Sequence, residues 1–330
     1  RGQDRSLVRV LVTGGTGLLG RGLAKSLRER GDDVTVFQRH PSGLDVAEQL
    51  GDVADRAAVR TAVAGADAVV HLAARVGVTG SWSDFERTNI EGTRAVVTEA
   101  ASAGVGRLVF VSSPSVAHAG SSLVGAGAEP ADPEATHGHY ATSKAAAELV
   151  ALGGATDGFA VTAVRPHLVW GPGDTQLVGR IVDRARQGRL AIVGTGAALI
   201  DTTYIDNAVD AIVAAVDRAP GLSGRALVVS NGQPRPVREL LSRIVTAAGL
   251  PSPRFRVPAA AAKAGGRAIE EVWERRGLEA DPPMTSFLAE QLATAHWFDQ
   301  RETRRALDWT PAVTLEEGFI RLAAWFASES

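Results

Sequence analysis

Apolar residues recur with a strand-like spacing at the start of the chain and then change to a helical spacing. Residues 8–12 form a β-branched, apolar run of strand length. The run stops at the glycine-rich stretch 13–17, after which leucines recur every fourth position from residue 19 to residue 27. Gly31 is well placed to end that helix. The pattern predicts a strand, a tight turn and a helix in that order.

Further apolar runs alternate with helix-length segments along the first half of the chain. Residues 34–39, 68–74 and 107–111 have the composition of buried strands. A long helix is predicted from about 82 to 103, and another opens at Tyr140. Strands that alternate with helices of this length predict an α/β fold, a Rossmann-type doubly wound parallel sheet whose ligand lies at the carboxyl ends of the strands.

Composition narrows the possible classes of protein. Of the 330 residues, 45% are apolar and 22% charged, which is typical of a globular protein. The net charge is −2 with no basic block, so neither a nucleic acid nor an anionic membrane is indicated as a partner. The chain has no cysteine, which excludes disulfides, thiolate metal sites and cysteine nucleophiles, and we predict no metal. No apolar run has the length of a membrane span, and the polar start RGQDRS is not a signal peptide, so we expect a cytoplasmic location.

The first turn carries three glycines spaced as G-x-x-G-x-x-G, at Gly14, Gly17 and Gly20. A backbone this bare can turn sharply, approach a pyrophosphate closely and present the N–H groups of the next helix to negative charge. Glycine-rich turns are also common for steric reasons alone. Here the strand, turn and helix occur in the required order, which favours dinucleotide binding. The residues expected at the pyrophosphate are Gly14, Thr16, Gly17, Leu18 and Leu19.

The end of the second predicted strand indicates which dinucleotide binds. NAD-binding units of this type place an acidic residue there to bond the ribose 2′-hydroxyl, whereas this chain has Gln38 followed by Arg39. Without a carboxylate there is no repulsion of a 2′-phosphate, and Arg39 could hold one. An ordinary solvated arginine is the alternative. We therefore predict NADP(H) over NAD(H). The other expected cofactor contacts are Asp52 and Val53 at the adenine, and Leu72, Ala73 and Ala74 where small residues end a buried strand.

A second group of residues suits acid–base chemistry. Tyr140 and Lys144 are four positions apart at the start of a helix and therefore share one face. A phenol with a pKa near 10 is a poor acid–base group at neutral pH, and a nearby ammonium favours the phenolate by about 1–3 pKa units. Ser112 and Ser113 end the preceding strand, where a hydroxyl can bond a carbonyl oxygen. His71, in contrast, is expected to be a packing residue.

Composition also shifts toward the end of the chain, where prolines at 251, 253 and 258 precede a helix-prone stretch at 259–276. These amphipathic segments indicate a smaller, mainly helical C-terminal lobe that binds substrate. The predicted NADP-binding Rossmann domain takes residues 1–170, with 200–232 returning to it, and the predicted substrate-binding lobe takes 171–199 and 233–330.

Over most of its length the chain resembles an extended short-chain dehydrogenase/reductase. The segments that carry the resemblance are TGGTGLLG, GDVAD, VVHLAA, TNIEGT, VFVSSPSV, YATSK and VRPHLVWGPGD. The resemblance implies that Ser113, Tyr140 and Lys144 are catalytic: Tyr140 exchanges the proton, Lys144 lowers its pKa and holds the nicotinamide ribose, and Ser113 orients the carbonyl. It also implies a homodimer. Its further site residues are Asn89, which supports the site, and Pro166, His167 and Leu168, which contact the nicotinamide carboxamide.

Within that family, one position distinguishes sugar-nucleotide enzymes from enzymes of apolar carbonyl compounds. Ile200 stands where the former usually carry an arginine that binds a substrate phosphate. The chain instead resembles the 3β-hydroxysteroid dehydrogenase-like branch, in particular reductases of apolar β-keto acids of the 2-alkyl-3-oxoalkanoate type. Alternatives are a hydroxysteroid or other alcohol dehydrogenase, a nucleotide-sugar epimerase and a non-catalytic NADP-sensing regulator. The expected substrate contacts are Ser113, Tyr204 and His139, although the two last could simply be packed.

Overall fold

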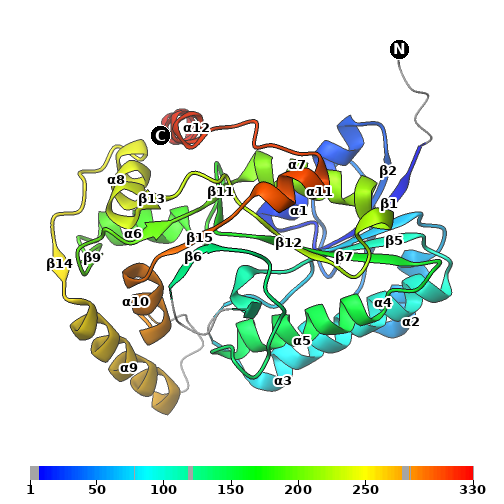
Figure 1. The fold of residues 1–330 in the computed structure, drawn as a ribbon, viewed down its shortest axis with the longest axis horizontal. Helices are drawn as coiled ribbons and strands as arrows, with labels where there is room; N and C mark the ends of the chain where they lie inside the picture. Colours follow the sequence, from blue (N-terminus) through cyan, green and yellow to red (C-terminus); the bar gives the residue numbers. More distant parts are fainter. Residues whose placement is uncertain (1–6, 78, 118–121, 277–281, 283, 330) are drawn as a thin grey trace.

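The computed structural model describes residues 7–77, 79–117, 122–276, 282 and 284–329, and it is built around one parallel sheet (Figure 1). Seven strands pair in the order β12-β7-β5-β4-β1-β2-β3, and every pairing between neighbours is parallel. This confirms the doubly wound Rossmann-type fold, with β4 in the middle and β1 beside it. The strands are β1 (Arg9–Thr13), β2 (Asp33–Gln38), β3 (Ala47–Leu50), β4 (Ala68–His71), β5 (Arg107–Val111), β7 (Ala160–Pro166) and β12 (Ala226–Val229).

Helices cover both faces of this sheet. In Figure 1, α1 and α7 lie above it, whereas α2, α4 and α5 lie below. The central strands are therefore buried on both sides: Val10 and Val12 belong to one apolar cluster, and Leu11 between them belongs to the other. Such two-sided burial explains why the strands are continuously apolar. The helices are α1 (Leu18–Glu29), α2 (Arg56–Val63), α4 (Gly92–Ser102), α5 (His139–Gly153), α7 (Ile205–Arg218) and α11 (Arg301–Leu307), with 3₁₀ turns at Pro114–Ala117 and Ala219–Leu222.

The helix predicted at 82–103 is divided into three parts. It begins as α3 (Trp82–Phe85), widens into a π-helix, η1 (Glu86–Glu91), and continues as α4. A π-helical turn inside an α-helix often marks a functional site, because the extra residue per turn redirects side chains. Here the π-helical turn carries Asn89, which lies buried at 1% exposure.

The C-terminal lobe is built from short strands and helices. A four-stranded sheet of order β13-β10-β15-β6 joins segments that are far apart in the sequence, and two two-stranded pairs, β11-β8 and β14-β9, complete it. Its strands are β6 (Leu123–Ala126), β8 (Val169–Trp170), β9 (Ile192–Val193), β10 (Leu199–Ile200), β11 (Thr203–Tyr204), β13 (Arg235–Pro236), β14 (Arg256–Val257) and β15 (His296–Phe298). Its helices are α6 (Val178–Arg186), α8 (Val237–Ala247), α9 (Ala259–Arg276), α10 (Ser286–Ala293) and α12 (Leu315–Ser328).

The chain crosses between the two parts more often than the predicted boundaries describe. Strand β6 lies within predicted domain 1–170 but pairs with β15 in the small sheet. Helix α11 comes from the predicted lobe, yet it packs on α7 and β12 of the main sheet. Both crossings depend on contacts between segments more than 70 residues apart, which local patterns do not report. Among the helices described, none combines the length and apolarity that crossing a membrane would need.

Candidate active site

The glycine turn connects β1 to α1 at the carboxyl edge of the main sheet, and each of its three glycines meets a different requirement. Gly14 has φ +79°, and a Cβ there would lie 2.8 Å from the backbone nitrogen of Ala73. A Cβ on Gly20 would lie 2.3 Å from the carbonyl oxygen of Gly14. Gly17 is different, because among the described residues other than its chain neighbours the atom nearest to its Cβ position is the Gly14 carbonyl oxygen, at 3.8 Å. Tight turn and close packing thus account for Gly14 and Gly20, whereas Gly17 leaves open space beside the backbone.

That open space lies at the amino end of α1, where an anion fits. Gly17 is the N-cap residue and has an extended backbone (φ −70°, ψ 161°), with no side chain capping the helix. The first N–H groups of a helix have no partner within the helix and carry the positive end of its dipole. A pyrophosphate would accept hydrogen bonds from these groups at the place where a side chain would obstruct it. The loop therefore fits a dinucleotide.

The adenosine-ribose end holds a carboxylate that the sequence pattern did not reveal. Gln38, at the end of β2, is buried, and its Nε2 donates to Glu48 on the neighbouring strand β3 at 2.8 Å. The backbone N–H of Ser42 donates to the same carboxylate at 2.7 Å. Hydrogen bonds from the Ser42 side chain, the Ser42 backbone and Gln38 hold the pKa of Glu48 below its usual range. Arg39 is exposed and makes no hydrogen bond or ion pair with any residue that the structure describes.

The other predicted cofactor residues lie along the same edge. Asp52 follows β3, accepts a hydrogen bond from the Ala54 N–H and pairs with Arg87 at 2.8 Å. Val53 is buried under the π-helical region, against Gly92. After β4, Ala73 donates its N–H to the Thr13 hydroxyl at 3.1 Å, which ties this strand end to the glycine turn. Leu72, Ala73 and Ala74 are all partly buried there.

The three residues predicted to be catalytic come from two neighbouring elements. Ser113 follows β5, and its Oγ lies 2.9 Å from the Oγ of Ser115. Tyr140 and Lys144 occupy the first turns of α5, which packs against β7 and the 3₁₀ turn after Ser113. A hydrogen bond with Ser113 lowers the pKa of Tyr140, which places the two hydroxyls together. Burial has the larger effect of the two, so the pKa of Tyr140 is raised above its usual value.

The Lys144 ammonium is held at the end of β5. Its ammonium donates to the carbonyl oxygen of Val111 at 2.8 Å and lies 4.1 Å from the ring centroid of Phe110. Burial lowers the pKa of Lys144 to about 7, partly opposed by the nearby carboxylate of Glu148. Burial is thus the largest influence on the pKa of both groups, and the lowering of the Tyr140 pKa by the ammonium stays a prediction.

Asn89 links the loop after β4 to the helix that carries Tyr140. Its Oδ1 accepts from the Arg75 N–H at 2.7 Å, and its Nδ2 donates to the Arg75 carbonyl at 3.1 Å and to the Ser143 hydroxyl at 2.9 Å. Ser143 in turn donates to the Tyr140 carbonyl at 3.0 Å. Asn89 is thus a positioning residue, and its place in the π-helical turn brings its side chain into contact with these partners.

The segment after β7 contains a strained residue and a buried histidine. Leu168 has φ +44°, a left-handed conformation that is uncommon for a leucine and is often found at functional sites. His167 lies buried with its Nε2 3.3 Å from the Nδ1 of His296, and its ring packs edge-on to Phe298. His296 and Phe298 belong to β15, so this contact joins the two parts of the molecule across more than 120 residues of sequence. The sequence pattern had not singled out His296.

The two further substrate candidates have different surroundings. His139 is exposed, directly precedes Tyr140, and has its Nδ1 3.3 Å from the Gly80 carbonyl oxygen. Tyr204 is only 2% exposed and packs in the core, edge-on to Trp170 with ring centroids 5.4 Å apart. Tyr204 is therefore a core packing residue, whereas His139 remains a candidate for substrate contact. His71 is buried between the hydroxyls of Thr13 and Thr93, as expected for a packing residue.

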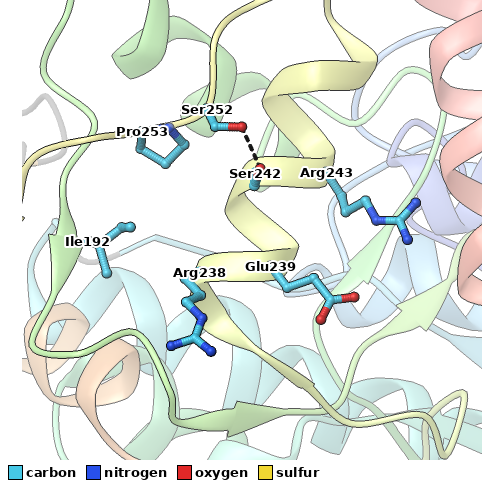
Figure 2. Close-up of a pocket in the computed structure, with 7 residues that line it drawn as sticks. All are labelled: Ile192, Arg238, Glu239, Ser242, Arg243, Ser252 and Pro253. Atoms are coloured by element: carbon cyan, nitrogen blue, oxygen red, sulfur yellow. Dashed lines mark hydrogen bonds between the residues drawn. The ribbon is translucent and has the colours of Figure 1, made fainter.

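A separate cavity of about 420 Å³ lies in the C-terminal lobe, along one side of α8 (Figure 2). Ser242 on the helix bonds Ser252 on the facing loop, and none of the predicted site residues lines the cavity. The lining residues are Ile192, Arg238, Glu239, Ser242, Arg243, Ser252 and Pro253.

Comparison with known proteins identifies the family. Residues 10–230 match the family described as "NAD dependent epimerase/dehydratase family". The chain belongs to this family of extended short-chain dehydrogenases/reductases. It is 43% identical to a 2-alkyl-3-oxoalkanoate reductase of Stenotrophomonas maltophilia, covering 96% of this chain and 99% of that protein. It is 34% identical to the protein of the same name from Shewanella oneidensis (95% and 85% covered) and 29% identical to a 3-beta-hydroxysteroid dehydrogenase of Mycolicibacterium neoaurum (97% and 92%).

Solved structures support the fold. The chain aligns with MoeE5 in complex with UDP-glucose and NAD at a TM-score of 0.76 and 24% identity, covering 97% of this chain and 99% of that one. It aligns with the Bordetella bronchiseptica enzyme WbmH in complex with NAD+ at a TM-score of 0.73 and 22% identity, covering 98% and 100%. The protein is an oxidoreductase with a nicotinamide dinucleotide site, and its relatives include members of the 3β-hydroxysteroid dehydrogenase-like branch.

Proposed function

We propose that the protein is an NADP(H)-dependent reductase that delivers hydride to the 3-keto group of an apolar β-keto acid of the 2-alkyl-3-oxoalkanoate type. The observation that carries the proposal is the meeting of the Ser113 and Tyr140 hydroxyls at the sheet edge that also bears the glycine turn. Two relatives of at least 34% identity that bear the name 2-alkyl-3-oxoalkanoate reductase supply the substrate class.

In this proposal each side chain has a defined task. The nicotinamide, when bound, supplies the hydride that becomes the new C–H bond at carbon 3. Ser113 donates a hydrogen bond to the keto oxygen and stabilises its developing negative charge. Tyr140 donates the proton that converts this oxygen into the hydroxyl. Because burial raises the pKa of Tyr140, the phenol stays protonated at neutral pH, which suits a proton donor and therefore the reductive direction.

The proposed preference for NADP(H) depends on Arg39. This guanidinium is exposed directly after β2 and has no partner among the described residues, so it is available to a 2′-phosphate. Glu48 acts in the opposite direction, because its low pKa keeps a negative charge nearby. Arg39→Ala should raise KM for NADPH about tenfold or more, the loss of one charge-assisted hydrogen bond, and leave KM for NADH nearly unchanged. Equal losses with both cofactors would contradict the preference.

The buried position of Ile200 supports an apolar substrate. The side chain is 5% exposed, in β10 beside Arg235, within the main apolar cluster. It can neither pair with a substrate diphosphate nor be moved out of the core without cost. A nucleotide-sugar epimerase is therefore disfavoured. A hydroxysteroid dehydrogenase remains the second candidate, because a relative with that name aligns over 97% of the chain.

The test is an assay of NADPH oxidation with three substrates in parallel: a long-chain 2-alkyl-3-keto acid, a 3-ketosteroid and a UDP-sugar. We expect rapid oxidation with the keto acid alone, and slower oxidation when NADH replaces NADPH. Turnover of the steroid alone would be consistent with the proposed catalytic residues but would contradict the proposed substrate class. Tight NADPH binding without turnover of any of the three would favour a sensing regulator and overturn the enzymatic proposal.

A further inference from the structure

We propose that Arg75 binds the carboxylate of the substrate and so selects β-keto acids over neutral ketones. This inference rests on the proposed function, which requires a substrate with a carboxylate two carbons from the carbonyl carbon that is reduced. An apolar pocket alone would bind that carboxylate poorly, because removing an unpaired charge from water is costly. A cation near Ser113 and Tyr140 is therefore needed.

The topology places Arg75 at the reacting end of the sheet. Strand β4 lies between β1, which leads into the glycine turn, and β5, which leads into Ser113. Arg75 follows the carboxyl end of β4 by four residues, directly after the predicted cofactor contacts Leu72, Ala73 and Ala74. In a doubly wound sheet the ligand lies at this edge. Arg75 thus follows the strand that lies between those leading to the glycine turn and to Ser113.

The backbone of Arg75 is held more firmly than a surface loop requires. The buried side chain of Asn89 bonds both its N–H, at 2.7 Å, and its carbonyl, at 3.1 Å. The same amide bonds Ser143, which donates to the Tyr140 carbonyl. The position of Arg75 is therefore coupled to that of the proposed proton donor through two intervening hydrogen-bonded residues, Asn89 and Ser143. Asn89 would therefore position Arg75 as well as the helix that carries Tyr140.

The guanidinium itself lies against α3, which packs on α5. It lies 5.3 Å from the ring centroid of Phe85, and that ring is 5.9 Å from the ring of His139, the residue before Tyr140. A Cβ on Gly80 would lie 2.4 Å from the Arg75 Nη2, and the carbonyl of Gly80 contacts His139. Phe85 and Gly80 thus each lie between the guanidinium and His139, the residue that precedes the proton donor.

The guanidinium of Arg75 forms only a weak ion pair within the described part of the protein. Its carboxylate neighbour is Asp84, at 3.7 Å, and the two side chains are 40% and 54% exposed. An exposed pair at this distance contributes little. The Nε of Arg75 is buried and has no hydrogen-bond partner among the described residues, which leaves a donor for a ligand. A planar guanidinium binds a carboxylate through two parallel hydrogen bonds, and a substrate carboxylate can compete with Asp84.

The experiment compares two substrates that differ only in this charge. We would measure oxidation of a 2-alkyl-3-hydroxy acid and of its methyl ester with NADP+, since the hydroxy acid does not decarboxylate as a β-keto acid does. Arg75→Met keeps the length of the side chain and removes its charge. We expect the ratio of kcat/KM for acid over ester to fall about ten- to hundredfold, mainly through KM for the acid, as for a lost charged hydrogen bond. Arg75→Lys should recover part of that ratio.

Two further variants separate this role from others. Asp84→Asn removes the competing carboxylate, so KM for the acid should fall two- to threefold while KM for the ester stays unchanged. Arg184→Met serves as the matched control, because Arg184 is a partly buried arginine on α6 that could also hold a carboxylate. We expect it to leave the acid-to-ester ratio unchanged.

The outcomes distinguish this inference from the proposed function. If wild-type protein oxidises the acid but Arg75→Met keeps the same acid-to-ester ratio, Arg75 does not bind the carboxylate, and the proposed function stands. If Arg184→Met instead lowers the acid-to-ester ratio, the carboxylate binds at α6, and the assignment of Arg75 is overturned. If wild-type protein oxidises neither acid nor ester but does oxidise a hydroxysteroid, the proposed function fails and this inference fails with it.

Discussion

Lys144 donates a hydrogen bond to the carbonyl oxygen of Val111 at 2.8 Å, so its ammonium group is held at the end of β5. The two residues are 33 positions apart, and the bond fixes α5 against the strand that delivers Ser113. Burial around this contact lowers the pKa of Lys144 to about 7. The lysine therefore loses its charge near neutral pH unless a bound cofactor stabilises it.

This pKa predicts a pH dependence of cofactor capture. A lysine with a lowered pKa carries its charge below that pKa and loses it above, so kcat/KM for the cofactor should decrease as the pH rises from 6 to 8. We would measure it with NADH as well as NADPH, because NADH has no 2′-phosphate that titrates near pH 6. Lys144→Arg keeps its charge throughout, so its profile should be flat over that range. A flat wild-type profile would contradict the assignment.

The glycine turn predicts opposite outcomes for two neighbouring substitutions. Gly17→Ala should leave the melting temperature nearly unchanged, since its backbone is extended and its Cβ position is open. It should weaken NADPH binding by about tenfold or more, which corresponds to ~1.4 kcal/mol. Gly20→Ala should lower stability, because its Cβ would collide with the Gly14 carbonyl. Calorimetry and fluorescence titration of NADPH would test both; a Gly17→Ala protein that melts early but binds normally would contradict the assignment.

The two tyrosines of the chain form a natural matched pair. Tyr140→Phe should reduce kcat by about 10²–10⁴-fold, the usual contribution of a positioned acid, and leave the Kd for NADPH nearly unchanged. Tyr204→Phe should keep kcat within about threefold of wild type, because its ring is buried in the core beside Trp170. Its effect should be seen in the melting temperature instead. Comparable losses of kcat in both variants would contradict the proton-donor role.

Local patterns predicted the elements of the fold well. The strand Arg107–Val111 and the helix Ala259–Arg276 have the predicted bounds, and β2 is displaced by a single residue. The periodicities of strands and helices are local properties, so a window of about 11–18 residues is enough to detect them. The glycine spacing is equally local, and it placed the turn that fits a dinucleotide.

Contacts between distant segments could not be predicted in this way. The partner of Lys144, the Glu48 carboxylate beside Gln38 and the pairing of His167 with His296 all depend on which strands become neighbours. The same holds for the buried ion pair between Arg165 and Glu148, both 1% exposed, which puts charges inside an otherwise apolar layer. Burial also raises the pKa of Tyr140, an effect that local patterns do not report because desolvation depends on the whole fold.

His71 predicts how the stability of the protein depends on pH. It is fully buried between the hydroxyls of Thr13 and Thr93, and burial, helped by the charge of Lys144, lowers its pKa to about 3. The unfolded chain binds a proton at this histidine near pH 6.5 while the folded protein does not, so stability should be full above that pH and decrease below it. Each pH unit costs about 1.4 kcal/mol, or roughly 2 kcal/mol by pH 5.

The test of His71 is urea unfolding at several pH values between 7 and 5, a range above the acid titration of Glu99, whose pKa its arginine partners hold at about 2. His71→Asn should be less stable than wild type at pH 7, because it leaves one of the two threonine hydroxyls without its partner. Its stability should nevertheless depend less steeply on pH, by about one proton. Since His167 and His296 are also buried, the comparison is between the slopes of the two proteins rather than their absolute values. Parallel slopes would show that His71 accepts a proton in the folded protein.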